Sequence, residues 1–274
     1  MKNYDFYYPY VGGKNRDIKF FESQLIEIDF KKIKYIVEPF GGSSALSRYL
    51  YFNKGLQDKK YLINDLDSQL IDFYKYVKRY GSKKLIEEYN KVIENLDKDK
   101  YKLLYEEYKT TTDKNRKLQL LFILSKLCFR TRLGLLNTRD GRAKKKIDKP
   151  CEIDKFYKNK KVEYSNKDFK EILNKYKDNE EAFIFLDPPY FDSFNSYYIT
   201  YNKDRKTKDK VIIDNTSIFI DILEFMKSCK CKVMLIINSN KILEHIYKDF
   251  IKGDYDKIYQ ITKNKTKHLI CTNY

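Results

Sequence analysis

A short apolar run that ends in an acid, two prolines and an aromatic residue is the feature that most constrains this chain. Residues 182–186 have the pattern of a buried β-strand, and Asp187, Pro188, Pro189 and Tyr190 follow at once. Two successive prolines fix the backbone and remove two backbone donors, so the acid and the ring leave the strand in one geometry. The alternative is an ordinary proline turn in which Asp187 only helps to form the turn.

Two earlier strands carry a second pattern. Residues 35–38 form a predicted buried strand, and a turn containing Gly41 and Gly42 leads from it into a helix. A strand, a glycine turn and a helix together place a cofactor at the amino end of the helix. The next predicted strand, residues 61–64, ends at Asp65, at the spacing from Gly42 where an acid usually holds ribose hydroxyls. The turn is neither a dinucleotide fingerprint nor a P-loop, so a purely structural turn is the alternative.

The alternation of strands and helices is interrupted once. Residues 66–127 carry helical stripes of apolar residues and no strand pattern, and we assign these stripes to the core. Alternation resumes after Pro150, and a hairpin closes the chain. We therefore predict an α/β fold, a Rossmann-like sheet with helices on both faces and an inserted helical and β-hairpin domain. The catalytic domain would comprise residues 1–65 and 151–274, and the insert residues 66–150.

A basic segment near the end of the insert points to nucleic acid. Residues 129–149 are rich in Arg and Lys around Asp140-Gly141, a strong hairpin signal. The chain has 56 Lys and Arg against 39 Asp and Glu, a formal net charge of +17, which favours a polyanionic partner. The alternatives are a solvated charged loop and the composition of an AT-rich genome. The residues predicted to contact DNA are Arg130, Arg132, Asn137, Arg139, Arg142 and Lys144.

Composition excludes several other classes of protein. The five cysteines are odd in number and form no Cys-x-x-Cys pair, and the two histidines have no ligand spacing with them, so we expect free thiols and no metal. No apolar run approaches the length of a membrane span. We expect a soluble, cytoplasmic protein, located in the host cytoplasm if the chain is viral.

In their order along the chain, these motifs resemble those of the S-adenosylmethionine-dependent DNA adenine-N6 methyltransferases of the Dam type. Tyr10-Val11-Gly12-Gly13-Lys14 comes first, then Glu38-Pro39-Phe40-Gly41-Gly42-Ser43, Asn64-Asp65, the insert and Asp187-Pro188-Pro189-Tyr190. The resemblance spans nearly the whole chain and implies that the insert recognises the target. Two residues depart from the family pattern: Tyr10 stands where Trp is usual, and Ser44 stands where the second glycine of the loop is usual.

Adenine methylation requires the residue types that end the strand at 182–186. An exocyclic amine is a poor nucleophile until its two hydrogens are accepted, and Asp187 with the Pro188 carbonyl can accept both. Tyr190 would stack on an adenine flipped out of the duplex. By the resemblance, the residues that bind S-adenosylmethionine are Tyr10, Gly12, Lys14, Glu38, Pro39, Phe40, Gly42, Asp65, Asp168, Phe169 and Asp187.

The sequence thus predicts a site-specific adenine methyltransferase whose partner is double-stranded DNA. Two alternatives stay open: a non-catalytic DNA-binding protein that retains the fold, and a methyltransferase that acts on RNA or protein. Residues of a nuclease site are not evident, so any restriction endonuclease would be a separate partner.

Overall fold

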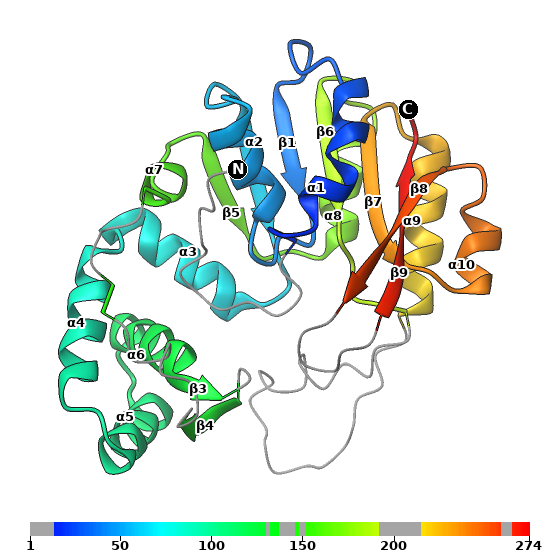
Figure 1. Ribbon diagram of the computed structural model, residues 1–274. Coiled ribbons are helices and arrows are strands. Elements are labelled where there is room, and N and C mark those ends of the chain that lie inside the picture. Colours follow the sequence, from blue (N-terminus) through cyan, green and yellow to red (C-terminus); the bar gives the residue numbers. More distant parts are fainter. Residues whose placement is uncertain (1–13, 130–131, 137–145, 148–151, 192–214, 259–264) are drawn as a thin grey trace.

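The architecture is an α/β sheet with a helical group attached at one side (Figure 1). In Figure 1, α4, α5 and α6 lie away from the sheet, and α3 lies between them and the strands. The computed structural model describes residues 14–129, 132–136, 146–147, 152–191, 215–258 and 265–274.

Seven strands form the main sheet in the order β5-β2-β1-β6-β7-β9-β8. β9 is antiparallel to both of its neighbours, and the pairings among β5, β2, β1, β6 and β7 are parallel. Because chain order reverses between β1 and β6, the carboxyl ends of these two strands flank the topological switch point, where α/β proteins bind ligands. The strands are β1 (Tyr35–Glu38), β2 (Lys60–Asn64), β5 (Val162–Ser165), β6 (Ala182–Leu186), β7 (Lys232–Asn238), β8 (Ile251–Ile258) and β9 (Lys265–Thr272).

Alternate residues of each central strand face opposite sides of the sheet and enter two separate cores. In β6, Phe183 and Phe185 pack into the core that also contains α2 and α3, whereas Ile184 packs with α8 and α9. This confirms the predicted sheet with helices on both faces. Around the sheet are α1 (Ile18–Phe21), the 3₁₀ helix η1 (Glu22–Glu27), α2 (Ala45–Asn53), α7 (Asp154–Tyr157), α8 (Phe169–Tyr176), α9 (Thr216–Ser228) and α10 (Lys241–Ile246).

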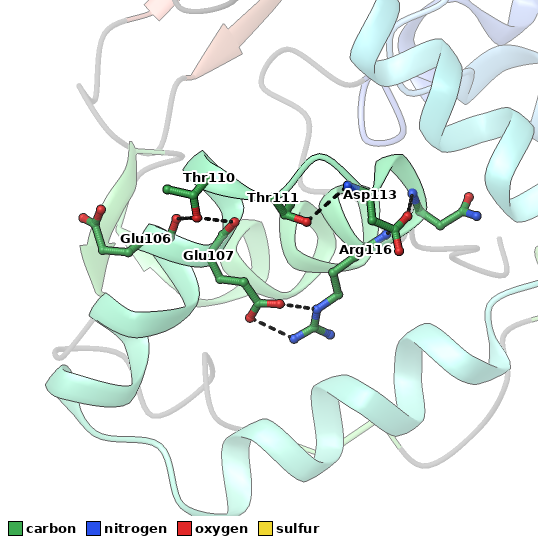
Figure 2. Close-up of polar contacts among 7 residues, drawn as sticks. Glu106, Glu107, Thr110, Thr111, Asp113 and Arg116 are labelled. Carbon is green, nitrogen blue, oxygen red and sulfur yellow. Dashed lines mark hydrogen bonds and ion pairs between the residues drawn. The ribbon is translucent and has the colours of Figure 1, made fainter.

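The insert is helical, as its apolar stripes predicted. Acids placed before the helices explain where several of them begin: Asp67 accepts the backbone N–H groups of Gln69 and Leu70, and Asp113 caps the last helix of the group in the same way. A bidentate pair between Glu107 and Arg116 joins α5 to α6 (Figure 2). The elements are α3 (Ser68–Tyr80), α4 (Lys83–Glu94), α5 (Lys98–Thr110), α6 (Lys114–Leu127), β3 (Cys128–Phe129) and β4 (Arg132–Leu136).

Two hairpins were predicted, one in the insert and one that closes the chain. In the insert, β3 and β4 pair antiparallel, with Cys128 opposite Leu136 and Phe129 opposite Arg132. Leu133 and Leu136 of β4 pack against the helical core. The Asp140-Gly141 signal itself lies outside the described residues. The closing hairpin β8–β9 is confirmed, and its first strand begins at Ile251, four residues earlier than expected.

Candidate active site

The Asp187 carboxylate lies at the carboxyl end of the central strand β6 and is paired with a buried lysine. Lys14 Nζ lies 2.7 Å from Asp187 Oδ1, and the two side chains are 3% and 20% exposed. Burial raises the pKa of Asp187, and the nearby Lys14 ammonium opposes that rise. The predicted catalytic acid and the predicted cofactor-site lysine therefore meet at the sheet edge.

The backbone after the two prolines is held by two amides that the sequence analysis did not single out. Asn215, at the start of α9, donates from Nδ2 to the Tyr190 carbonyl at 3.0 Å. Asn238, the last residue of β7, accepts the Phe191 N–H at 3.3 Å. Both amides are buried, and they hold the backbone at Tyr190 and Phe191. The Tyr190 ring lies edge-on to His268 with ring centroids 5.4 Å apart.

The glycine turn lies against the neighbouring strand β2. A Cβ on Gly41 would lie 2.6 Å from the Ile63 side chain and 2.9 Å from the Asn64 carbonyl, so only glycine fits here. The next turn residues, Gly42 and Ser44, have φ angles of 44° and 51°. This left-handed conformation favours glycine, and Ser44 adopts it at the position where the family pattern has glycine.

Three side chains from different elements hold this turn. Asp65 Oδ2 accepts the Gly42 N–H at 2.9 Å, the Tyr74 hydroxyl donates to the Gly42 carbonyl, and Arg48 Nε donates to the Ser43 carbonyl at 3.1 Å. The sequence pattern indicated Asp65 only. Tyr74 was assigned to the core of the insert, and its stack on Tyr157 with centroids 5.2 Å apart agrees with that, but its hydroxyl also positions the turn.

Two buried acids flank the turn. Glu38, at the end of β1, is 2% exposed and accepts the Ser47 N–H at 2.7 Å. Burial raises the pKa of Glu38 to about 7 and that of Asp65 to about 6, although backbone N–H groups oppose the rise at both. A cationic ligand beside these acids would stabilise their charged forms, which burial disfavours.

The ends of three strands are tied together by Asn64. Its Nδ2 donates to the carbonyls of Pro39 and Lys167, both at 2.9 Å, and its Oδ1 accepts the Lys167 N–H. Asn64 is buried, and a polar amide at the end of an apolar strand was the signal for such a role.

Aromatic and apolar surfaces lie beside these strand ends. Phe40 packs on Phe169 with ring centroids 5.0 Å apart, and Asp168 is exposed and caps α8 by accepting the Lys170 N–H. Leu66, next to Asp65, is 67% exposed although its side chain is large and apolar. The sequence analysis did not select Leu66; an apolar residue directly after a strand-end acid was the available signal.

Several predicted site residues lie outside the described part of the chain. They include Tyr10 and Gly12 of the predicted cofactor set. Of the predicted DNA contacts, Arg132 has a described backbone in β4 but no described side chain. The other predicted DNA contacts outside the described residues are Arg130, Asn137, Arg139, Arg142 and Lys144.

Within the described residues, no group of three or more His, Cys, Asp or Glu side chains could hold a metal ion. The cysteines there, Cys128, Cys229, Cys231 and Cys271, form no disulfide bond with one another. No helix in the described part of the chain is both long enough and apolar enough to cross a membrane.

The sheet order and the polar strand ends define a Rossmann-like protein of the methyltransferase class. A family model, D12 class N6 adenine-specific DNA methyltransferase, matches residues 10–267. The chain belongs to this family, and it is an enzyme that methylates adenine in DNA at N6. It is similar to the Type II methyltransferase M.CviBI of Paramecium bursaria Chlorella virus NC1A, with 24% identity over 281 residues, 96% of this chain and 97% of that protein. The predicted family and activity are confirmed.

Proposed function

We propose that the methyl donor is S-adenosylmethionine, that the substrate is a specific adenine flipped out of duplex DNA, and that Asp187, Pro188 and Tyr190 are the catalytic residues. The observation that carries this proposal is the Asp187 carboxylate, held by Lys14 at 2.7 Å beside the acid-lined glycine turn. A hydrogen-bond acceptor for the substrate amine and two buried acids suited to a cationic donor therefore lie at one switch point of the sheet.

Asp187 and the Pro188 carbonyl act on the substrate amine. The adenine amino group is flat because its lone pair is delocalised into the ring, and accepting both of its hydrogens directs that lone pair outward. The ring fixes φ of Pro188, and the following Pro189 restricts its ψ to extended values, so the Pro188 carbonyl has little freedom to turn. Tyr190 stacks on the flipped base, which contributes about 1–3 kcal/mol to binding.

The described residues around the glycine turn fit S-adenosylmethionine. Glu38 would face its ammonium group, and Gly42 with Pro39 would line the methionine part. Asp65 would accept hydrogen bonds from the ribose hydroxyls, using the lone pairs that its bonds to backbone N–H groups leave free. When bound, the donor supplies an electrophilic methyl group on a positively charged sulfur. The remaining residues of the proposed cofactor set are Tyr10, Gly12, Lys14, Phe40, Asp168, Phe169 and Asp187.

Target recognition is proposed for the insert, residues 66–150, with residues 1–65 and 151–274 as the catalytic domain. The net charge of +17 supports binding to a polyanion. A separate restriction endonuclease as partner is supported by the relation to a Type II methyltransferase. A cytoplasmic location is where such an enzyme would meet DNA. The proposed DNA contacts remain Arg130, Arg132, Asn137, Arg139, Arg142 and Lys144.

Methyl transfer from labelled S-adenosylmethionine to unmethylated genomic DNA tests the proposal, with Asp187→Ala alongside. The native protein is expected to place N6-methyladenine at one short motif, and Asp187→Ala to lower the rate at least about 10²-fold. Asp256→Ala is the matched control, because this exposed acid lies on β8 and pairs with Lys265. Undiminished activity of Asp187→Ala would refute the catalytic assignment. Cofactor binding without turnover on DNA would contradict the whole proposal.

A further inference from the structure

A second ion pair lies at the segment that carries Lys14, where the Asp17 N–H donates to the Lys14 carbonyl at 2.8 Å. Lys257 Nζ on β8 lies 2.5 Å from Oδ2 of Asp17, and the two side chains are 14% and 6% exposed. The Tyr255 hydroxyl lies 3.5 Å from the same Asp17 oxygen. The two partners of this pair are 240 positions apart, at opposite ends of the chain. Only the closing hairpin brings them together beside the site.

The two pairs act on each other electrically. Lys257 lowers the pKa of Asp187 and Asp17 raises it, although burial has the largest effect. In turn, burial and Lys14 lower the pKa of Lys257, whereas Asp17 and Asp187 raise it. Two cations and two anions therefore share one poorly hydrated region, and their formal charges cancel.

Other titratable groups near this region do not replace the second cation. His268 on β9 is buried, and its pKa is lowered to about 3 by burial and by the two lysines, so it is neutral at physiological pH. Glu38 on β1 lies near enough for Asp187 to raise its pKa. Tyr190 and Tyr255 contribute ring surfaces beside His268. Among the groups that shift Asp187, the cations are Lys14 and Lys257.

We propose that Lys257 is a positioning residue that keeps the Asp187 carboxylate charged and available to the substrate amine. This inference rests on the proposed function, because the amine is the partner proposed for Asp187. A protonated Asp187 would carry an O–H donor on one oxygen and be a weaker acceptor at the other, so it would hold the substrate amine less well. Lys14 directs its ammonium at Oδ1, and Lys257 is a second cation that favours the charged form of the same carboxyl.

The test measures the ionisation of Asp187 directly in the full-length protein. Carboxyl-labelled aspartate is introduced, and the Asp187 signal is identified by its loss in Asp187→Asn. We expect Lys257→Met to raise the pH of the Asp187 titration by about one pH unit, the order expected for the loss of one nearby charge in a buried site. Asp17→Asn should move it in the opposite direction, and Lys257→Arg should leave it close to native.

Lys267→Met is the matched control, because Lys267 lies on the same hairpin and pairs with Asp254, with about half of each side chain exposed. This variant should leave the Asp187 titration unchanged. The proposal is wrong if Lys257→Met does not move the titration, or if Lys257→Met and Asp17→Asn move it in the same direction, as a general loosening of the fold would do.

The pH profile of methyl transfer separates this proposal from the proposed function. Its acid limb should follow the Asp187 titration in each variant. A titration that shifts while the profile stays unchanged would contradict the catalytic role of Asp187 and still support the action of Lys257 on the carboxylate. Lys257→Arg also guards against misfolding, because it retains the charge and should retain the profile.

Discussion

Ion pairs occur both at the active-site edge of the sheet and in the helical insert, but their surroundings differ. At the edge, Lys14 is 3% exposed in its pair with Asp187. In the insert, the pair of Lys83 and Glu87 has side chains that are 78% and 54% exposed. Exposed pairs are screened and contribute about 0–1 kcal/mol, whereas buried charges lose hydration and depend strongly on their partners. The active-site charges are thus costly to bury, which is consistent with a role in function rather than stability.

The pKa directions differ in the same way. Burial raises the pKa of Glu38 to about 7, whereas Arg116 lowers the pKa of Glu107 in the insert. Figure 2 shows the reason for the second shift: the guanidinium of Arg116 faces both carboxylate oxygens of Glu107 near the surface. The folded structure therefore disfavours the charged form of Glu38 and favours the charged form of Glu107.

The largest expected effect on the free energy of unfolding is at Asn64, whose hydrogen bonds join three strand ends. Asn64→Ala should lower the free energy of unfolding by about 3–4 kcal/mol, because it leaves the Pro39 carbonyl and both backbone groups of Lys167 without this partner. Urea unfolding measures this loss. Asn166→Ala is the control: Asn166 also donates to two carbonyls, but it is exposed and water can replace it. Equal losses in both variants would contradict the difference between buried and exposed amides.

The pH dependence of stability provides the next test. The folded protein holds the Glu38 proton more tightly than the unfolded chain, so stability present below about pH 4.5 is lost as the pH rises through about 7. The loss is on the order of 3 kcal/mol, and Glu38→Gln should remove it. Asp65 contributes in the same direction. Glu107 has the opposite sign, since its stabilisation is lost as the pH falls through its lowered pKa.

Unfolding free energies at pH 5 and pH 8 measure this difference for the native protein and for Glu38→Gln. If the native protein loses no more unfolding free energy between pH 5 and pH 8 than Glu38→Gln does, the pKa of Glu38 is not raised in the folded state.

A smaller effect is expected where the backbone approaches β2. Gly41→Ala should cost about 1–3 kcal/mol, because the new Cβ would meet the Ile63 side chain and the Asn64 carbonyl. The displaced turn should also weaken binding of the methyl donor, which calorimetric titration measures. Gly253→Ala is the control, since its Cβ would meet only the Ile270 side chain at 3.9 Å. Unchanged donor affinity in Gly41→Ala would argue against a cofactor role for the turn.

The smallest effect is expected in the insert. Glu107→Gln should change the free energy of unfolding by less than about 1 kcal/mol, because both partners of its pair are partly exposed. Methyl transfer should stay at the native rate. A large loss of activity in this variant would show that the Glu107–Arg116 pair affects methyl transfer. The insert would then not differ from the active-site region in the way described above.

Local patterns were sufficient for the strands and for the acids that end them. The run at 182–186 was identified as a buried strand because all five residues are apolar, and it is β6. Helices in the insert followed from their stripes and from acids such as Asp67. The hairpin predicted at Asp140-Gly141 stays a prediction, because these residues lie outside the described part of the chain. In β4, Leu133 and Leu136 pack on the helical core.

By itself, the sequence determined the order of strands and helices, the residues at the strand ends and the family to which the motifs belong. These depend on periodicity and turn chemistry within a few neighbouring residues. Only the tertiary structure decided which side chains hold those ends: Tyr74 on the Gly42 carbonyl, Asn215 on the Tyr190 carbonyl and Asp17 on Lys257. Each partner is distant in sequence, and the contacts exist because the sheet and its two cores bring remote segments to one edge.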